Sequence, residues 1–276
     1  MKLRRYTPRT FILELIMLCL CAVFVIPLYY LVVSTFKSQA AIIQSPLGLP
    51  LPPTLDNYRR ALEVMSFFRN FGNSTLITSV SVVLIVVFGS LAAYSIARRK
   101  TPLMAFLGFY FLIGFMVPVQ TTLIPLFRIM KTLDLINRYG GMIFLHSNGC
   151  VFAILLYRGF IRTVPMDLEE SAFLDGAGPF RTFWRIVFPL IQPITATLII
   201  FNVMWIWNDF LLTYLFLSST KKATLIMQVY NGIGLYMNDW SLMMPVLVLA
   251  LAPMVIFYLL MQKRIIGGLT SGAIKG

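Results

Sequence analysis

Six long apolar runs constrain this chain more than any other feature of its sequence. A helix needs about 20 mostly apolar residues to cross a bilayer, and each run is long enough for one span. Of all residues 59% are apolar and 12% charged, against roughly 45–50% and about 25% in soluble proteins. We therefore predict an all-α, polytopic membrane protein with six transmembrane helices in one domain, residues 1–276. The runs lie at about 11–33, 75–97, 103–127, 141–161, 191–216 and 242–262.

The placement of basic residues predicts the orientation of the spans. Cytoplasmic loops of membrane proteins carry an excess of Lys and Arg. With the N-terminus inside, the inner segments hold 14 of the 23 Lys and Arg residues, including the compact cluster Arg98-Arg99-Lys100. We therefore predict that both termini are cytoplasmic. The net charge of +13 then reflects contact with anionic lipid headgroups rather than with nucleic acid.

Two segments outside the central spans need interpretation. The first run follows basic residues, as a secretory signal does, but it is too long for one and no A-x-A-like cleavage site follows. We expect a retained span. The segment at about 37–74 begins with several prolines and continues as a polar, helix-like stretch from Leu55 to Arg69. We expect an outer loop there and not a second domain.

The sequence offers little for catalysis or for a bound cofactor. Its three cysteines lie inside apolar runs without a C-x-x-C pair, and there is one histidine, His146, to which we assign no role. No zinc site, disulfide framework or Ser-His catalytic set is indicated. No G-x-x-x-x-G-K-[ST] motif occurs, so the chain cannot hold nucleotide phosphates in a P-loop. We expect no enzyme activity and no cofactor bound by this chain.

The loop at about 162–190, predicted to be cytoplasmic, is the most informative segment. Pro165 and the acidic residues after it favour a helix start, Asp175-Gly176 favours its end, and Gly178-Pro179 favours a second start. The sequence predicts two short helices joined by a sharp turn. These helices carry large apolar side chains that need a cover: Leu168, Phe173, Leu174, Phe180, Phe183 and Trp184.

Two kinds of cover remain open for these side chains. They could pack against the chain's own helices or lie at the lipid headgroups. Alternatively, a helix could dock in the groove of a partner protein. Pro189 and Pro193, which follow, could stiffen the connection to the fifth span or could simply mark helix starts.

The spacing within this loop resembles a known motif. Glu170-Ser171-Ala172 is followed after three residues by Gly176 and after nine more by Ile186-Val187-Phe188-Pro189. This is similar to the EAA loop of permease subunits of ATP-binding-cassette importers, with Ser171 in place of Ala and Phe188 in place of Leu. Trp207-Asn208-Asp209-Phe210 and the Gly-rich end from Gly267 resemble the carbohydrate branch, in particular the second permease of maltose-type transporters.

The resemblance implies a function and several partners. A separate cytoplasmic ATPase dimer would use ATP and Mg and act on the loop at 164–189, a second permease would complete the pathway, and an extracytoplasmic binding protein would deliver a sugar. The chain would lie in the cell membrane of a prokaryote. Glu169 or Glu170 would pair with basic groups of the ATPase, and the Gly-rich tail would reach it. The expected coupling residues are Leu168, Glu169, Glu170, Ser171, Ala172, Asp175, Gly176, Ile186 and Pro189.

The translocation pathway is predicted from polar groups within the fifth span. Intramembrane polar residues usually face a cavity or a bundle interior. The candidates are Asn202, Trp205, Asn208 and Asp209, although a tryptophan here could also be an interfacial anchor. Another small polar solute is the alternative to a sugar. An ion-driven secondary transporter is disfavoured because the spans contain almost no acids apart from Glu14 and Asp209.

Overall fold

The fold consists of helices grouped into two compact units. The computed structural model describes residues 7–236 and 238–273, with residues 264–273 described by their backbone alone, and no strand occurs in this part of the chain. Two expectations rest on residues outside the described part. These are the basic residues before Thr7 and the last three residues of the Gly-rich tail. The first unit comprises Met1–Phe68 and Gln228–Ala252, and the second comprises Arg69–Met227 and Pro253–Gly276.

Membrane spans can be recognised by length and composition. Four stretches of the described chain pass this test: Pro8–Ser34, Phe67–Arg98, Tyr139–Ile161 and Trp240–Lys263. The count rises to six if each of two bent helix pairs forms one span. The chain is therefore a multi-pass membrane protein, and each of the six expected spans overlaps one of these helices or pairs.

The first unit holds helices α1 to α3 and the segment that leads into the last helix. No part of the apolar window of α1 (Pro8–Ser34) is buried within the described chain. Between α2 (Gln39–Gln44) and α3 (Asp56–Val64) the loop is held by Lys37, whose buried ammonium donates to the carbonyl oxygens of Ser45 and Pro46 at 2.9 and 3.1 Å. The ammonium group of Lys37 therefore stabilises the fold of this loop.

The helix-like stretch expected from Leu55 to Arg69 is interrupted. Helix α3 ends at Val64, α4 (Phe67–Arg98) begins at Phe67, and Ser66 between them has φ +43°. The positive φ of Ser66 interrupts the helix, because a right-handed α-helix requires a negative φ at every residue. The unit closes with most of α14 (Leu225–Tyr236) and the first part of α15 (Trp240–Ala273).

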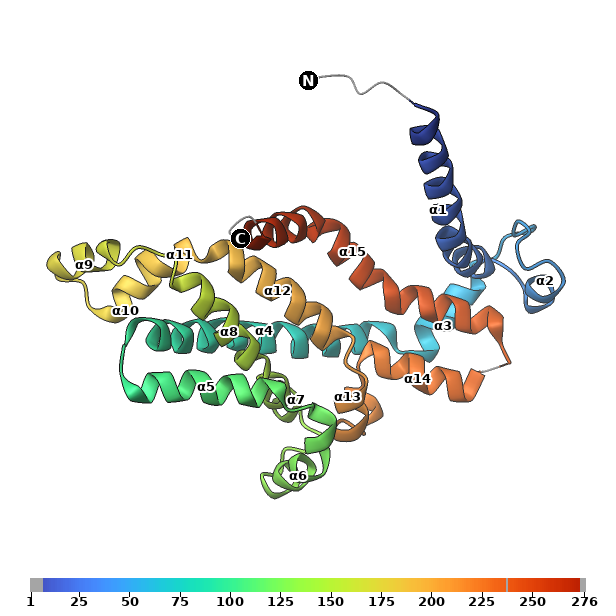
Figure 1. Cartoon of the computed structure of the whole chain (residues 1–276). Coiled ribbons are helices and arrows are strands. Elements are labelled where there is room, and N and C mark those ends of the chain that lie inside the picture. The colour runs from blue at the N-terminus through green and yellow to red at the C-terminus, as the bar shows by residue number, and fades with distance from the viewer. Residues whose placement is uncertain (1–6, 237, 274–276) are drawn as a thin grey trace. The chain divides into compact units, whose positions relative to one another are not determined.

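The second unit is built on α4, α5 (Pro102–Met116), α8 (Gly149–Ile161) and α12 (Gln192–Trp207), of which α8 packs against both α5 and α12 (Figure 1). Small residues allow close approach, as is usual between membrane helices. A Cβ atom on Gly89 of α4 would lie 2.6 Å from the Cβ of Ala153, and one on Gly149 would lie 2.6 Å from Oδ1 of Asn202. Such contacts fix how closely α8 packs against α4 and α12.

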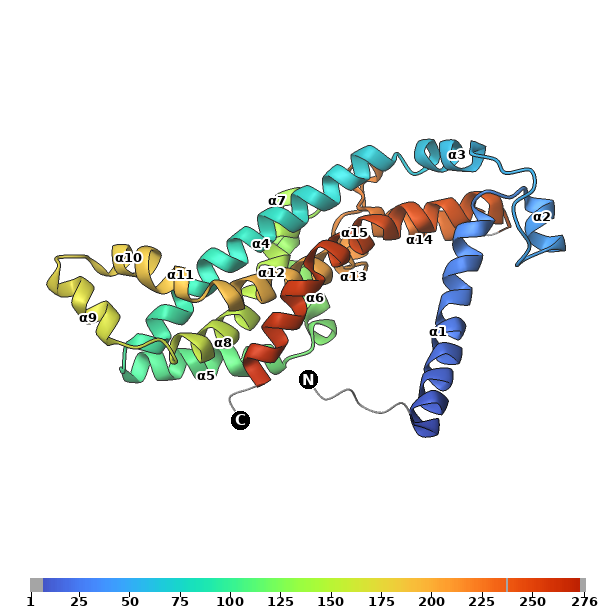
Figure 2. The same ribbon diagram turned by 90° about the horizontal axis from the view of Figure 1, so that it is seen from above.

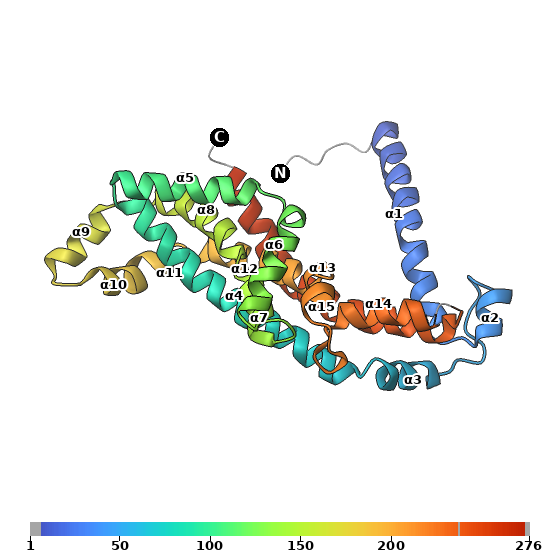
Figure 3. The same cartoon turned by 90° about the horizontal axis from the view of Figure 1, so that it is seen from below.

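The third expected span, 103–127, is not one straight helix. Helices α5 and α6 (Val119–Thr132) meet at an angle of 103° (Figure 3). Pro118 lacks the N–H that would continue α5, and it holds Val117 in an extended conformation (φ −78°, ψ 119°). Pro118 therefore ends one helix and starts the next, so this expected span is bent sharply at the proline.

The fifth expected span, 191–216, is also broken. Helix α12 ends at Trp207, and α13 (Leu211–Phe216) follows as a separate helix in contact with α7 (Tyr139–His146). The Asn208 amide donates to the carbonyl of Met204 at 2.8 Å, and Asp209 accepts from the N–H of Leu212. These side chains offer the backbone local alternatives to a continuing helix, which ends α12.

The loop at about 162–190 forms a hairpin beyond the adjoining ends of α4 and α5 (Figures 1 and 2). Its arms are α9 (Asp167–Leu174) and α10 (Pro179–Thr182), which contact one another. A π-helical turn (Phe183–Val187) and α11 (Phe188–Leu190) lead back to α12. Helix α9 begins at Asp167, two residues after Pro165, with Met166 as its cap.

Candidate functional site

The turn of the hairpin has a defined hydrogen-bond pattern. The N–H of Ala177 donates to the carbonyl of Ala172 at 2.9 Å, and the N–H of Gly176 donates to that of Phe173 at 3.0 Å. This pair of bonds is the Schellman motif, which requires a left-handed residue directly after the helix. Gly176 has φ +79°, a conformation in which a side chain would be strained. A glycine at this position is thus needed for the sharp turn.

The inner face of α9 is anchored by an ion pair. The carboxylate of Glu169, of which 5% is exposed, lies 2.6 Å from Nη2 of Arg98 and accepts from the hydroxyl of Tyr94 at 2.7 Å. Arg98 also donates to the carbonyl of Val164 at 3.0 Å. The guanidinium thus joins the end of α4 both to α9 and to the segment that leads into it.

This arrangement contradicts the expected availability of Glu169. We expected Glu169 or Glu170 to pair with a partner protein, but the first is buried against Arg98 while the second is exposed. From the sequence alone Arg98 indicated only the orientation of the spans, and Tyr94 did not stand out. The sequence contained no signal for this pairing, because its members lie about 70 residues apart and meet only through folding.

Aromatic side chains fill the space beneath the hairpin. Phe183 is buried, with its ring centroid 5.1 Å from that of Tyr94 and 5.0 Å from that of Trp184. Phe188, which replaces the usual Leu of the motif, lies 4.8 Å from Trp184. Two of the six apolar side chains that needed a cover, Phe183 and Trp184, are therefore covered largely by the chain itself.

The outer face of the hairpin keeps the other four apolar side chains exposed. Their exposed fractions are 44% for Leu168, 46% for Phe173, 90% for Leu174 and 68% for Phe180. Glu170, Ser171 and Asp175 are exposed on the same short helix or directly after it, whereas Ala172 is buried. We call Leu168, Phe173, Leu174 and Phe180 the apolar tip of the hairpin.

The remaining motif residues lie on the return path to α12. Ile186 is half-buried in the π-helical turn, and Pro189 is exposed in the first turn of α11. Pro193 occupies the first turn of α12, and the path bends by 78° between Leu190 and Gln192. Both prolines stand where helices start, which agrees with the simpler of their two interpretations.

Three of the four expected pathway residues share one pocket in the second unit. Asn202, Trp205 and Asp209 line a pocket of about 530 Å³ together with His146 and residues at the break between α5 and α6. The pocket also receives the polar side chains of Gln120 and Asn148. Asn208 does not line it, because its amide turns back to the carbonyl of Met204.

The polar groups of this pocket differ in how they are held. Asn202 is 2% exposed and donates to the carbonyl of Leu198 at 2.9 Å, so it serves packing between α8 and α12 as well. Trp205 is 63% exposed, with its ring edge-to-face with that of Phe152. Nε2 of His146 lies 3.7 Å from Oδ2 of Asp209, a proximity that the sequence did not predict. The pocket thus combines an aromatic face with amide and carboxylate groups.

A comparison of the sequence with known families identifies the class of protein. Residues 85–270 match the family described as "Binding-protein-dependent transport system inner membrane component". The chain belongs to this family. The matched range contains the hairpin with its turn and every residue of the pocket.

Relatives of this inner membrane component are similar along nearly their whole length. The melibiose/raffinose/stachyose import permease protein MelC of Bacillus subtilis is 38% identical, over 93% of each chain. The multiple sugar-binding transport system permease protein MsmG of Streptococcus mutans is also 38% identical, over 91% of each chain. The probable starch degradation products transport system permease protein AmyC of Thermoanaerobacterium thermosulfurigenes is 31% identical, over 99% of this chain and 100% of its own.

A solved structure is similar in fold. It is a chain of a bacterial ABC transporter involved in the import of the acidic polysaccharide alginate, with a TM-score of 0.82 over 95% of this chain and 99% of that one. The two sequences are 22% identical, so the likeness concerns the fold. This inner membrane component therefore has the fold of an ABC importer permease, as the motif in its loop suggested.

Proposed function

We propose that the chain is the permease subunit through which a sugar or oligosaccharide enters a prokaryotic cell. It forms half of a translocation pathway whose other half is a second permease. A binding protein outside the cell delivers the solute, and a separate ATPase dimer in the cytoplasm hydrolyses ATP with Mg. The relatives that transport melibiose, raffinose, stachyose or several sugars support the choice of solute.

The single observation that carries the coupling role is the apolar tip. Leu174 is 90% exposed at the end of a helix that the Glu169–Arg98 ion pair fixes to α4. Exposed apolar patches on firmly held elements are typical of docking sites, and a short helix in a partner's groove is a common mode of recognition. Glu170 and Asp175, exposed beside the tip, provide charges for the rim of such a groove.

The fixed inner face explains how docking could move the spans. Because Arg98 lies at the end of α4 and Phe183 belongs to the core, a force on α9 acts on α4 and on the path to α12 together. Rigid-body motion of packed helices is a standard route for opening one side of a pathway and closing the other.

The pocket supports the pathway role. Carbohydrates combine hydroxyl groups with apolar ring faces, and the exposed ring of Trp205 beside amide and carboxylate groups suits both kinds of surface. We assign the polar lining of the pathway to Asn202, Trp205 and Asp209, and we remove Asn208 from it on the basis of its backbone bond.

The coupling proposal is tested by Leu174→Asp, which places a charge on the tip without touching the core. We expect the ATPase subunit that co-purifies with the native chain in mild detergent to be lost from a correctly inserted variant. The matched control is Leu51→Asp, which changes an 81% exposed leucine in the outer loop and should retain the ATPase. Retention of the ATPase by both variants would contradict docking at the tip.

The solute proposal is tested by uptake of radiolabelled sugars into cells that carry the complete transporter. We expect Trp205→Ala to raise the KM for the transported sugar by about tenfold, the effect of about 1.4 kcal/mol of lost binding. Phe109→Ala, an exposed ring on α5 outside the pocket, is the control. Uptake of another small polar solute in place of every sugar tested would overturn the carbohydrate assignment and leave the permease role intact.

A further inference from the structure

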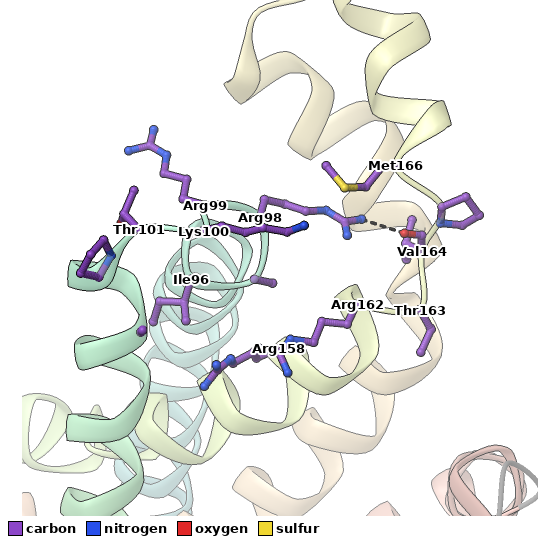
Figure 4. A pocket seen from close by; sticks show the side chains of 14 residues that line it. Ile96, Arg98, Arg99, Lys100, Thr101, Arg158, Arg162, Thr163, Val164 and Met166 are labelled. Atoms are coloured by element: carbon purple, nitrogen blue, oxygen red, sulfur yellow. Dashed lines mark hydrogen bonds between the residues drawn. The ribbon is translucent and has the colours of Figure 1, made fainter.

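A second pocket lies between two connections of the second unit, next to the segment that leads into the hairpin. It has a volume of about 830 Å³ and is bounded by the α4–α5 connection and by the segment between α8 and α9 (Figure 4). Among the described residues that line it there is no aspartate or glutamate. Its basic lining residues are Arg98, Arg99, Lys100, Arg158 and Arg162.

Two of these five cations do not serve the pocket. Arg98 is bound to Glu169 and to the carbonyl of Val164, as the dashed line in Figure 4 marks for the latter. Arg99 points away from the other basic side chains (Figure 4). Lys100, Arg158 and Arg162 remain, and none of them forms an ion pair with a carboxylate of the described chain.

Arg158 is held in a position that needs an anion. Its Nε atom is buried without a hydrogen-bond partner among the described residues, and its guanidinium lies so close to α5 that a Cβ on Gly108 would meet Nη1 at 2.5 Å. Arg162, the C-cap residue of α8, follows one turn after Arg158, where two like charges repel each other. Burial of an unpaired donor and repulsion between neighbours both cost stability, which a bound anion would restore.

The carbonyl ends of α4 and α8 offset part of this charge, because the C-terminus of a helix carries about half a negative charge. These partial charges are too small to neutralise three cations. The surroundings indicate its source. Pro102 and Ala105 of α5 line the pocket, and Leu103 and Phe106 of the same helix are 60% and 61% exposed, as expected for side chains that face acyl chains.

We propose that Lys100, Arg158 and Arg162 bind the phosphate of an anionic phospholipid whose acyl chains lie along the exposed face of α5. Basic pockets between transmembrane helices are suited to such headgroups. The placement of this lipid in the cytoplasmic leaflet rests on the proposed orientation, whereas the anion site rests on the geometry of the pocket alone.

Native mass spectrometry of the full chain in mild detergent tests the proposal. The chain is titrated with phosphatidylglycerol, with zwitterionic phosphatidylcholine and with inorganic phosphate. We expect the double variant R158Q/R162Q to bind phosphatidylglycerol about 30-fold more weakly than the native chain, because two of the three cations are lost.

The control R128Q/K131Q removes two exposed cations of α6 and should bind phosphatidylglycerol as the native chain does. Because Arg158 packs against Gly108, the variant K100Q/R162Q, which changes only exposed side chains, repeats the test.

The other outcomes separate the possible ligands. Equal binding of phosphatidylglycerol by all the chains overturns the lipid site. A site that takes inorganic phosphate with the same dependence on Arg158 and Arg162, but not the lipid, overturns the lipid assignment and upholds an anion site. A third outcome is that all chains bind the lipid equally but R158Q/R162Q loses the ATPase. This result would overturn the lipid site and indicate that the cations bind an acidic side chain of a protein partner. None of these readouts depends on transport, so the result is independent of the solute proposed above.

Discussion

Neighbouring residues of the same type serve different purposes in this chain. Glu169 and Glu170 follow each other on α9, yet the first is buried in an ion pair and the second is exposed. A helix places consecutive residues about 100° apart, so one faces α4 while the other faces away. The basic residues differ in the same way, because Lys37 and Arg98 hold backbone carbonyls whereas Arg158 holds none in the described chain.

Glu169→Ala should detach the inner face of α9 from α4. Removing one partner of a buried ion pair typically costs about 3–5 kcal/mol, because the other charge stays buried and unpaired. We expect faster hydrogen exchange throughout α9 and earlier proteolytic cleavage at the hairpin. The exposed neighbour provides the control. Glu170→Ala should change the stability of α9 by no more than a few tenths of a kcal/mol, so exchange and cleavage should stay as in the native chain. Equal protection in both variants would mean that the ion pair does not hold the helix.

Acid should weaken the start of α15 through Asp239. Burial alone would raise the pKa of this carboxyl, but hydrogen bonds from the Ser241 hydroxyl and the Arg60 guanidinium hold the pKa below its ordinary value. A lowered pKa means that the stabilisation is present above the unfolded pKa of about 3.9 and is lost as the pH falls through the folded value.

The effect of pH can be measured by amide exchange at Leu242, whose N–H donates to Asp239 at 3.1 Å. Protection should be constant between pH 7 and pH 5 and should fall below about pH 4. In Asp239→Asn this acid-dependent loss should disappear. Because the Arg60–Asp239 pair is partly exposed, the change amounts to at most about 1 kcal/mol. An identical acid profile in both chains would exclude Asp239 as the titrating group.

At the scale of elements, helix ends decide the shape of the site. The pocket that contains Trp205 lies at the breaks after Met116 and Trp207, where two expected spans are interrupted. The apolar tip lies at the end of α9, where the Schellman turn reverses the chain. Both proposed functional surfaces therefore lie where a helix stops, since only there can backbone and side chains turn out of a packed bundle.

Gly176→Ala should weaken the turn of the hairpin. A left-handed conformation costs a non-glycine residue about 1–2 kcal/mol, so α9 should fray and the affinity for the ATPase should fall by about tenfold. Gly178→Ala is the matched control, because Gly178 has φ −71° and open space for a Cβ atom. The two variants can be compared by titrating the purified ATPase onto each. Similar affinities would mean that the turn contributes nothing to docking.

At the scale of the whole molecule, the proposed orientation assigns every loop to one side of the membrane. The hairpin and the α4–α5 connection should lie in the cytoplasm, and the loop around Leu51 should lie outside. This alternation follows from the excess of basic residues in the inner segments, which are retained during insertion.

Labelling of single cysteines tests this assignment in intact cells. After replacement of Cys19, Cys21 and Cys150, which are free thiols, one cysteine is introduced at Leu51 or at Leu174. Both positions are more than four-fifths exposed, at 81% and 90%. A membrane-impermeant maleimide should label the first in intact cells and the second only after lysis. The reverse pattern would invert the topology and move the hairpin away from any cytoplasmic ATPase.

The sequence by itself determined the helical fold, the approximate positions of the spans and the family. Apolar runs report the thickness of the bilayer, and the motif between Glu170 and Pro189 has a fixed spacing, so both are legible along the chain. Hydropathy does not show the breaks at Pro118 and Asn208, because it does not record where a backbone hydrogen bond is lost.

Only the tertiary structure decided the partners of the charged and aromatic side chains. It joined Glu169 to Arg98 and placed His146 beside Asp209, and it left Arg158 without a carboxylate among the described residues. These pairings depend on contacts between residues far apart in sequence. A pattern along one helix shows which face is apolar, but only the packing of several helices determines whether a given charge meets a counter-charge, a carbonyl or a pocket.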